Sequence, residues 1–247
     1  MKINKKQLIH IIGIGGIGMS GIAEILNDLG YSVQGSDIGL NSNILRLKGK
    51  KIKIFTGHSQ KNLKNVDLVI YSSAIKNNNN ELKFAKSKSI PSIPRSNILA
   101  QLVSLKKTIA VSGSHGKTTT TSLIASVLSN SNYKPTIING GIINEYGTNT
   151  KLGTGKWMVV EADESDSTFL ELPSTVSVVT NIDEEHLDHY KNFSNLKKSF
   201  KKFITQVPFY GCAIVCNDNQ HVKKIISKIT TTKIIKYGFN NAKKRLA

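Results

Sequence analysis

Short apolar runs alternate with amphipathic helical patterns along the whole chain. The apolar runs predict strands at 8–13, 32–35, 52–55, 67–71, 108–112, 157–161, 176–180, 212–216 and 233–237. A period of three to four residues predicts helices at 17–29, 79–87, 96–104, 117–129, 194–205 and 219–228. Strands and helices that alternate in this way are typical of an α/β protein, in which parallel sheets carry helices on both faces.

A stretch with two prolines and the helix after it indicate a domain boundary near residues 104–107. The stretch IPSIPRSN at 90–97 has two prolines, and the helix after it leads into the strand before a second glycine-rich loop. We therefore predict a Rossmann-like parallel-sheet domain at residues 1–104 and a P-loop ATPase-type α/β domain at residues 105–247.

The first glycine-rich loop has the spacing of a dinucleotide-binding turn. Gly13, Gly15 and Gly18 follow an apolar run directly, and Asp37 comes 19 residues after Gly18. Such a turn brings the backbone close to a diphosphate, which the next helix N-terminus attracts. The motif leaves open whether the ligand is NAD, FAD or a UDP-sugar, and a glycine turn that serves only packing is an alternative.

The second glycine-rich loop, GSHGKTT, is a shortened P-loop. Val111 stands where the first glycine of the longer motif would be, which leaves Gly113, Gly116, Lys117 and Thr118. Backbone N–H groups of the loop can cradle phosphate oxygens, the lysine can reach the β- and γ-phosphates, and the threonine can bind Mg²⁺.

An acidic cluster in a basic chain indicates a metal site near this loop. Nine of the sixteen acidic residues lie between Glu161 and Asp188. Glu161 ends one apolar strand, Asn181 ends another, and His186 follows. Since strand ends in parallel sheets carry ligands, we expect Mg²⁺ to be held there beside bound phosphates.

The net charge of +18 raises nucleic-acid binding as an alternative. The basic residues, however, are 31 lysines and three arginines spread along the chain, whereas base readout uses arginine. We therefore expect no nucleic-acid partner. No apolar run is long enough to span a membrane, and the basic start lacks a cleavage site, so we expect a cytoplasmic protein.

Six stretches together resemble the Mur ligases of peptidoglycan synthesis. They are HIIGIGGIGMSGIAEIL at 10–26, GSD at 35–37, SSAI at 72–75, GSHGKTTTTS at 113–122, EADESD at 161–166 and TNIDEEHLDHY at 180–190. The stretches occur in family order over nearly the whole chain, which makes them more specific than either glycine motif. An oxidoreductase using the first loop is disfavoured, because the P-loop would then have no purpose.

The resemblance implies that the first loop holds a UDP-sugar and the second holds ATP. The implied reaction is ATP-dependent amide formation: ATP phosphorylates the carboxylate of UDP-N-acetylmuramate, and the amine of L-alanine attacks the acyl phosphate. A related ligase that recycles muropeptides by adding a peptide to the same UDP-sugar is the second reading. The implied cofactors are ATP and Mg²⁺.

The resemblance also assigns residues. Lys117, Glu161 and His186 are expected to be catalytic, and Thr118, Glu161 and His186 to bind metal. The residues expected at ATP are Gly113, Ser114, His115, Gly116, Lys117, Thr118 and Thr119. The residues expected at the UDP-sugar are Gly15, Gly16, Ile17, Gly18, Met19, Ser20, Asp37, His58, Ser72, Ser73 and Arg95. His115 could instead serve only as the helix entry.

The chain departs from the family in three ways. Ser114 replaces a threonine, and KNNNNE at 76–81 replaces an asparagine-proline-glutamate stretch. The third departure is length, because Mur ligases have a third domain that carries the amino-acid site. We therefore expect residues 105–247 to be an incomplete central domain and the chain alone to be inactive in ligation.

Overall fold

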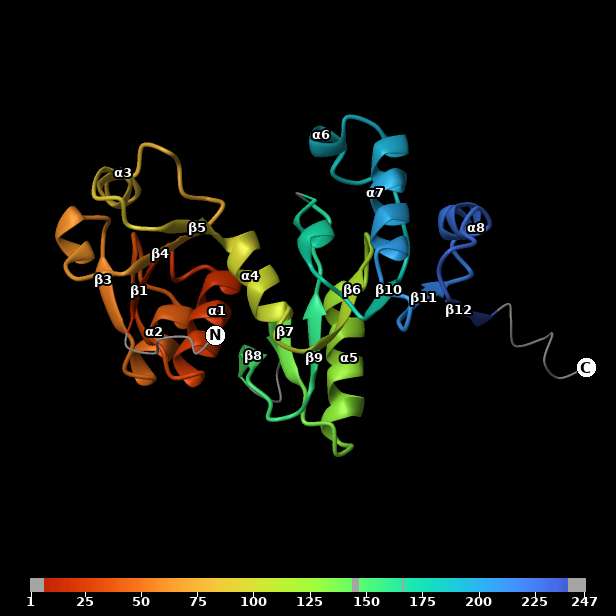
Figure 1. Ribbon diagram of the computed structural model, residues 1–247, viewed down its shortest axis with the longest axis horizontal. Coiled ribbons are helices and arrows are strands. Elements are labelled where there is room, and N and C mark those ends of the chain that lie inside the picture. The colour runs from red at the N-terminus through yellow and green to blue at the C-terminus, as the bar shows by residue number, and fades with distance from the viewer. Residues whose placement is uncertain (1–6, 144–146, 166, 240–247) are drawn as a thin grey trace, which may run out of the picture. The chain divides into compact units, whose positions relative to one another are not determined.

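The computed structural model describes residues 7–143, 147–165 and 167–239 (Figure 1). The chain divides into two compact units. The first contains Met1–Leu99 and Gly141–Leu152, and the second contains Ala100–Gly140 and Gly153–Ala247. Three parts of the predictions lie outside the described residues: the start of the first predicted domain at 1–6, the end of the second at 240–247, and Asp166 of the EADESD stretch.

A five-stranded parallel sheet forms the first unit. Its order is β3-β2-β1-β4-β5. The strands are β1 (Leu8–Ile12), β2 (Ser32–Asp37), β3 (Lys53–Thr56), β4 (Leu68–Tyr71) and β5 (Ser92–Pro94). The helices are α1 (Ile17–Asp28), α2 (Ser42–Gly49), the short η1 (Gln60–Leu63) and α3 (Asn80–Ser87), and α4 (Arg95–Val103) begins in this unit and ends in the second. The order reverses at β1, so the glycine turn after β1 lies at the switch point where such sheets bind ligands.

The central strand β1 explains why its sequence reads as a continuous apolar run. Ile11 and Ile12 are fully buried, as are Val69 and Ile70 on the neighbouring β4. A parallel strand covered on both faces has no solvent side, so it does not alternate. His10 is the polar exception in β1, and it is also fully buried.

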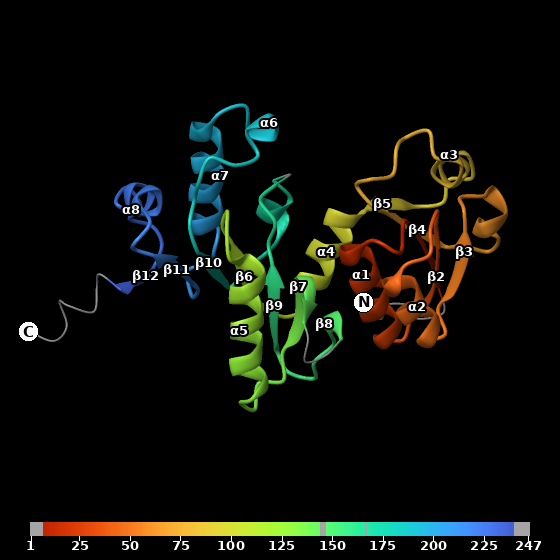
Figure 2. The same cartoon turned by 180° about the vertical axis from the view of Figure 1, so that it is seen from behind.

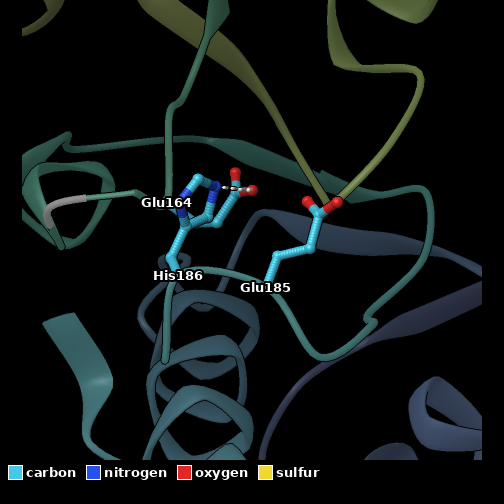
Figure 3. A group of neighbouring side chains, drawn as sticks. All are labelled: Glu164, Glu185 and His186. Carbon is cyan, nitrogen blue, oxygen red and sulfur yellow. Dashed lines mark ion pairs between the residues drawn. The ribbon is translucent and has the colours of Figure 1, made fainter. Parts of the chain in front are cut away.

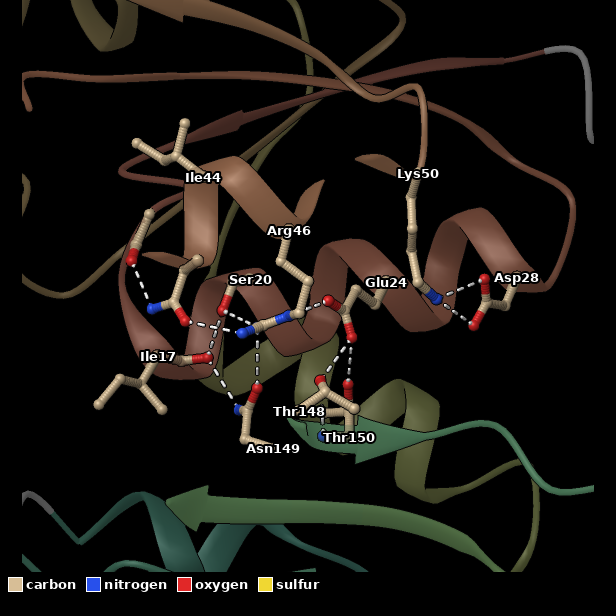
Figure 4. Close-up of polar contacts among 12 residues, drawn as sticks. Ile17, Ser20, Glu24, Asp28, Ile44, Arg46, Lys50, Thr148, Asn149 and Thr150 are labelled. Atoms are coloured by element: carbon tan, nitrogen blue, oxygen red, sulfur yellow. Dashed lines mark hydrogen bonds and ion pairs between the residues drawn. The ribbon is translucent and has the colours of Figure 1, made fainter. Parts of the chain in front are cut away.

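The segment Gly141–Leu152 belongs to the first unit through polar contacts with α1 (Figure 4). Glu24 of α1 is 2% exposed, and its carboxylate accepts hydrogen bonds from Arg46 Nε at 2.5 Å, Thr148 Oγ1 at 2.7 Å and Thr150 Oγ1 at 3.1 Å. The predicted division into 1–104 and 105–247 does not assign Gly141–Leu152 to the first unit. Nothing in the local sequence marks Thr148 and Thr150 as partners of a distant helix.

Glu24→Ala is expected to lower the free energy of unfolding by about 2–3 kcal/mol, because it leaves a mostly buried arginine and two hydroxyls without their acceptor. Asp28→Ala, which breaks the more exposed ion pair with Lys50, is expected to cost at most about 1 kcal/mol. Urea unfolding of both variants measures the difference. Equal costs would show that the buried carboxylate does not anchor the segment.

A seven-stranded sheet, in the order β12-β11-β10-β6-β9-β7-β8, forms the centre of the second part of the fold (Figure 2). Its strands are β6 (Lys107–Ser112), β7 (Thr136–Ile143), β8 (Thr148–Lys151), β9 (Trp157–Glu161), β10 (Val176–Val179), β11 (Cys212–Cys216) and β12 (Ile234–Tyr237). The helices are α5 (Lys117–Ser129), η2 (Thr168–Glu171), α6 (Leu187–Tyr190), α7 (Phe193–Thr205) and α8 (Gln220–Ile226). The pairings from β12 to β7 are parallel, so the ends of β6, β9 and β10 meet at one edge.

Helix α7 packs through one apolar face. Phe200 and Phe203 are fully buried, and their rings lie 5.4 and 5.1 Å from the ring of Phe169 in η2. This aromatic cluster anchors η2, in the chain between β9 and β10 that also carries Glu164. Within the described residues, no helix combines the length and the apolar character needed to cross a membrane. The predicted α/β fold class is confirmed.

Candidate nucleotide-binding sites

The P-loop between β6 and α5 has the backbone that its glycines predict. Gly113 has a φ of +143° and Gly116, the N-cap of α5, has a φ of +78°. A Cβ on Gly113 would overlap Thr180 Oγ1, so this position excludes any side chain. No side chain caps α5, and Thr118 and Thr119 in its first turn are exposed, so the helix N-terminus is open to an anion.

Gly113→Ala is expected to lower the free energy of unfolding by about 3 kcal/mol or more, since it adds a steric overlap to an unfavourable φ. Gly116→Ala also places a side chain at a positive φ, in the left-handed region, but without a neighbour within 4 Å, and it should cost about 1–2 kcal/mol. Thermal unfolding of the two variants compares them. A cost for Gly113→Ala no greater than that for Gly116→Ala would contradict the overlap.

The residues after β10 hold the P-loop in place. Asn181 accepts a hydrogen bond from His115 N at 2.8 Å and donates one to the His115 carbonyl at 3.0 Å. Thr180 Oγ1 donates to the same carbonyl at 2.7 Å, and Ser114 Oγ accepts from Asp183 N at 2.9 Å. Asn181 thus shapes the loop, a role that differs from the metal neighbour expected from sequence.

Lys117 is paired with a buried carboxylate that the sequence did not single out. Its Nζ lies 3.0 Å from both carboxylate oxygens of Glu164 and 2.9 Å from the Gly113 carbonyl. The Glu164 side chain is 1% exposed. Burial raises the pKa of Glu164, and the Lys117 ammonium opposes that shift. The loop lysine therefore has a buried counter-charge at the phosphate-binding edge.

Glu164, Glu185 and His186 form a compact group of metal-ligand atoms, which lie within 4.8 Å of one another (Figure 3). His186 Nε2 is 3.7 Å from Glu164 Oε1, and the imidazole and carboxylate face each other in the view. His186 adopts a φ of +55° as the N-cap of α6. Two carboxylates give the hard oxygen donors that Mg²⁺ prefers, and one of them, Glu164, is also the counter-ion of Lys117, so the chemistry of the group fits that metal.

The other two predicted metal ligands are Glu161 and Thr118. Glu161 ends β9 and accepts a hydrogen bond from Gly140 N at 2.8 Å, and Thr118 is exposed at the start of α5. Among the described residues, Glu161 does not belong to the group around His186. His115, 60% exposed, faces Asp183 and Glu185 at 3.4 and 3.7 Å. The feature of the sequence that could have indicated Glu164 is its position three residues after the buried strand β9.

The first glycine turn is fixed by side chains from the end of β2 and the start of α2. Gly13 has a φ of +78°. Asp37 Oδ2 accepts from Gly15 N at 2.8 Å, and Asn41 and Asn43 donate to the Gly15 carbonyl at 3.1 and 2.9 Å. Asp37 thus holds the turn itself, in addition to the ligand contact implied by the resemblance.

The guanidinium of Arg95 lies beside the N-terminus of α1. A Cβ on Gly18 would lie 2.8 Å from Arg95 Nε, so the missing side chain lets the guanidinium approach the helix. Arg95 Nε is buried and has no hydrogen-bond partner among the described residues. The N-cap Gly16 offers no side-chain bond, and the first turn has no acid. An orphaned donor beside open helix N–H groups suits a diphosphate.

The remaining predicted UDP-sugar residues divide into accessible and buried ones. Ile17 is 49% exposed and Ser73 is also exposed. Ser72 follows β4, and its Cβ would lie 3.2 Å from a Cβ on Gly13. Met19 and Ser20 are buried, and Ser20 Oγ donates to the Ile17 carbonyl, so these two support the turn from behind. His58 is partly exposed, with Nδ1 directed inward.

Two family models together match nearly the whole chain. Residues 8–107 match the family model "Mur ligase family, catalytic domain" and residues 111–247 match "Mur ligase middle domain". The UDP-N-acetylmuramate–L-alanine ligase of Methylocella silvestris is 54% identical over 94% of this chain and 50% of its own length. The relative of the same name from Brucella ovis is 53% identical over 94% of this chain. The chain spans about half the length of the curated relatives it matches.

Solved structures extend the similarity to the fold. The UDP-N-acetylmuramate–alanine ligase of Thermotoga maritima is 31% identical, with a TM-score of 0.81 over 88% of this chain and 50% of that one. A UDP-N-acetylmuramate:L-alanyl-γ-D-glutamyl-meso-diaminopimelate ligase from Neisseria meningitides shares the fold, with a TM-score of 0.86 over 94% of this chain and 78% of that one, at 24% identity. Two consecutive family models cover nearly the whole chain, so the chain belongs to the Mur ligase family.

Proposed function

We propose that the protein carrying this chain is an ATP-dependent ligase that joins L-alanine to UDP-N-acetylmuramate in peptidoglycan precursor synthesis. The observation that carries the proposal is the pair of phosphate-binding turns, each at the carboxyl edge of its own sheet. Two such turns suit two nucleotide ligands and one reaction that consumes ATP. The similar proteins named for this activity supply the substrate identities.

The first unit is proposed to bind the UDP-sugar. The N-terminus of α1 and Arg95 would hold the diphosphate, because they combine open N–H groups with an unpartnered guanidinium donor. Asp37 keeps the turn closed against β2 and leaves its remaining acceptor capacity for the ligand. No nicotinamide or flavin chemistry is assigned to this turn.

The second unit is proposed to bind ATP through the P-loop. Backbone N–H groups at the start of α5 and the Lys117 ammonium would stabilise the charge on the transferred phosphoryl group. Glu164, Glu185 and His186 would hold Mg²⁺, and Thr118 and Glu161 are kept as further proposed ligands. Bound Mg²⁺ would supply charge neutralisation at the phosphates. A carboxylate is a poor electrophile, and its phosphorylation provides the leaving group for amine attack.

The muropeptide-recycling reaction is the alternative activity. The relatives at 53–54% identity are named for L-alanine addition, whereas the structure named for peptide addition is 24% identical. We therefore favour L-alanine as the amine. Because ATP and UDP-sugars are cytoplasmic metabolites, we also place the reaction in the cytoplasm.

The test is phosphate release from ATP by a full-length protein that carries this chain. Release is expected only when UDP-N-acetylmuramate, L-alanine and Mg²⁺ are all present, and the product should contain one alanine. A tripeptide that replaces L-alanine at equal or higher rate would favour the recycling reaction. Release that does not depend on the UDP-sugar would overturn the proposal.

A further inference from the structure

A buried carboxylate in the first unit faces four polar side chains, three of which hydrogen-bond to it. Glu81, near the start of α3, is fully buried. Its Oε1 lies 2.7 Å from Asn62 Nδ2 and 3.4 Å from His10 Nε2. Its Oε2 lies 2.5 Å from Ser36 Oγ and 3.1 Å from His58 Nδ1. Asn62, Ser36 and His58 are hydrogen-bonded to the carboxylate, whereas His10 Nε2 lies at ion-pair distance and has no hydrogen-bond partner among the described residues.

Glu81 is ionised in this surrounding. Burial raises the pKa of Glu81, but the contacts with His10, Ser36 and Asn62 outweigh it and hold the pKa below its usual value. An ionised carboxylate only accepts hydrogen bonds, so each of its three hydrogen-bonded neighbours must present a proton to it.

This requirement assigns the protons on both histidines. Gln34 Nε2 donates to the Asn62 carbonyl at 2.8 Å and lies 3.2 Å from His10 Nδ1, so His10 accepts there and carries its proton on Nε2. Ser36 gives its one proton to Glu81. His58 Nδ1, 3.0 Å from Ser36 Oγ and 3.1 Å from Glu81, must therefore carry a proton. The nitrogen of His58 that remains for another partner is Nε2.

The carboxyl end of β2 contacts both the glycine turn and the residue before His58. The Ser36 carbonyl accepts from Gly13 N at 2.8 Å and from Ile14 N at 3.1 Å. The next residue, Asp37, accepts from Gly57 N at 2.7 Å, immediately before His58. His58 thus stands at the carboxyl edge of the sheet beside the turn, and its side chain is 15% exposed.

A buried ion is a weak way to stabilise a core, because apolar residues of similar volume stabilise as well or better. Glu81 therefore calls for a role other than packing. We propose that Glu81 is a positioning residue of the UDP-sugar site, which holds His58 with Nδ1 protonated so that Nε2 faces the bound ligand. This inference rests on the proposed function for the identity of the ligand.

The direct observable is the protonation of His58. In ¹⁵N-detected NMR of the unliganded 247-residue chain, His58 Nδ1 is expected to carry a proton over the pH range in which the ring is neutral. Glu81→Gln presents an amide donor and should shift that proton toward Nε2. A wild-type His58 with unprotonated Nδ1 would overturn the proposal, whether or not any variant folds.

A double-mutant cycle separates positioning from general destabilisation. Glu81→Gln is expected to weaken UDP-N-acetylmuramate binding by about 10- to 100-fold, by analogy with the loss of metal affinity when the partner of a metal-ligating histidine is removed. In a His58→Ala background the same change should have no further effect on Kd, because Glu81 acts through His58. Additive losses, or an unchanged Kd in Glu81→Gln alone, would overturn the proposal.

The matched control is Asp67→Asn, which alters a carboxylate that accepts from Leu8 N where β1 begins, away from the turn. Its Kd should equal that of the wild-type chain. If the wild-type chain binds no UDP-sugar, the proposed function fails; if it binds and the cycle is additive, only the role of Glu81 fails.

Discussion

Lys117→Ala is expected to lower ligation by at least about 10²–10³-fold in a full-length protein that carries this chain. Lys117 is the one charged side chain in the P-loop motif that can meet the transferred phosphoryl group, and its loss also leaves Glu164 without its 3.0 Å counter-ion. Turnover measured as ADP formation at saturating substrates reports the effect. UDP-N-acetylmuramate binding should change little, because that ligand is assigned to the first unit.

The matched control is Lys198→Ala on α7, where the lysine is exposed. This variant removes the same charge from the same unit and should retain wild-type turnover. Turnover of Lys117→Ala within tenfold of the wild type would contradict the role of the P-loop. A parallel loss in Lys198→Ala would point to net charge instead.

Glu164→Gln is expected to lower turnover by about 10²-fold and to raise the Mg²⁺ concentration needed for half-maximal rate. The amide keeps the shape of the side chain but removes the charge that faces both Lys117 and His186. Titration of turnover with Mg²⁺ measures both effects.

Glu171→Gln is the control for Glu164→Gln, since Glu171 is an exposed acid on η2, which also follows β9. It should leave the Mg²⁺ dependence unchanged. If Glu161→Gln alone shifts that dependence and Glu164→Gln does not, the metal is held at the end of β9 as the sequence predicted, and the group around His186 is not its site.

The parts of the fold that were predictable from sequence depend on local signals. The P-loop is an example: β6, two glycines and α5 follow one another directly, so motif and structure coincide. The short strand β5 is not among the predicted strands, because it contains a proline, which lowers strand propensity. It forms because it lies at a sheet edge, where proline is tolerated. Helix α2 was also not predicted, because its 8 residues are too few to show a clear helical period of apolar positions.

The parts that were missed depend on residues distant in sequence. Glu164 became visible only when Lys117 and His186, from two other segments, were placed around it. Asn181 looked like a metal neighbour because it ends a strand, but its amide is used by the backbone of His115. Glu81 gave no sequence signal, because its four partners come from strands and loops that only the sheet brings together.

The proposed function of the first unit depends on its glycine turn binding a UDP-sugar. Calorimetric titration of the 247-residue chain with UDP-N-acetylmuramate and, separately, with NADH tests it most directly. We predict saturable binding of UDP-N-acetylmuramate, weakened by Arg95→Ala because the guanidinium beside Gly18 is lost, and no saturable binding of NADH. Tighter binding of NADH than of UDP-N-acetylmuramate would contradict the account.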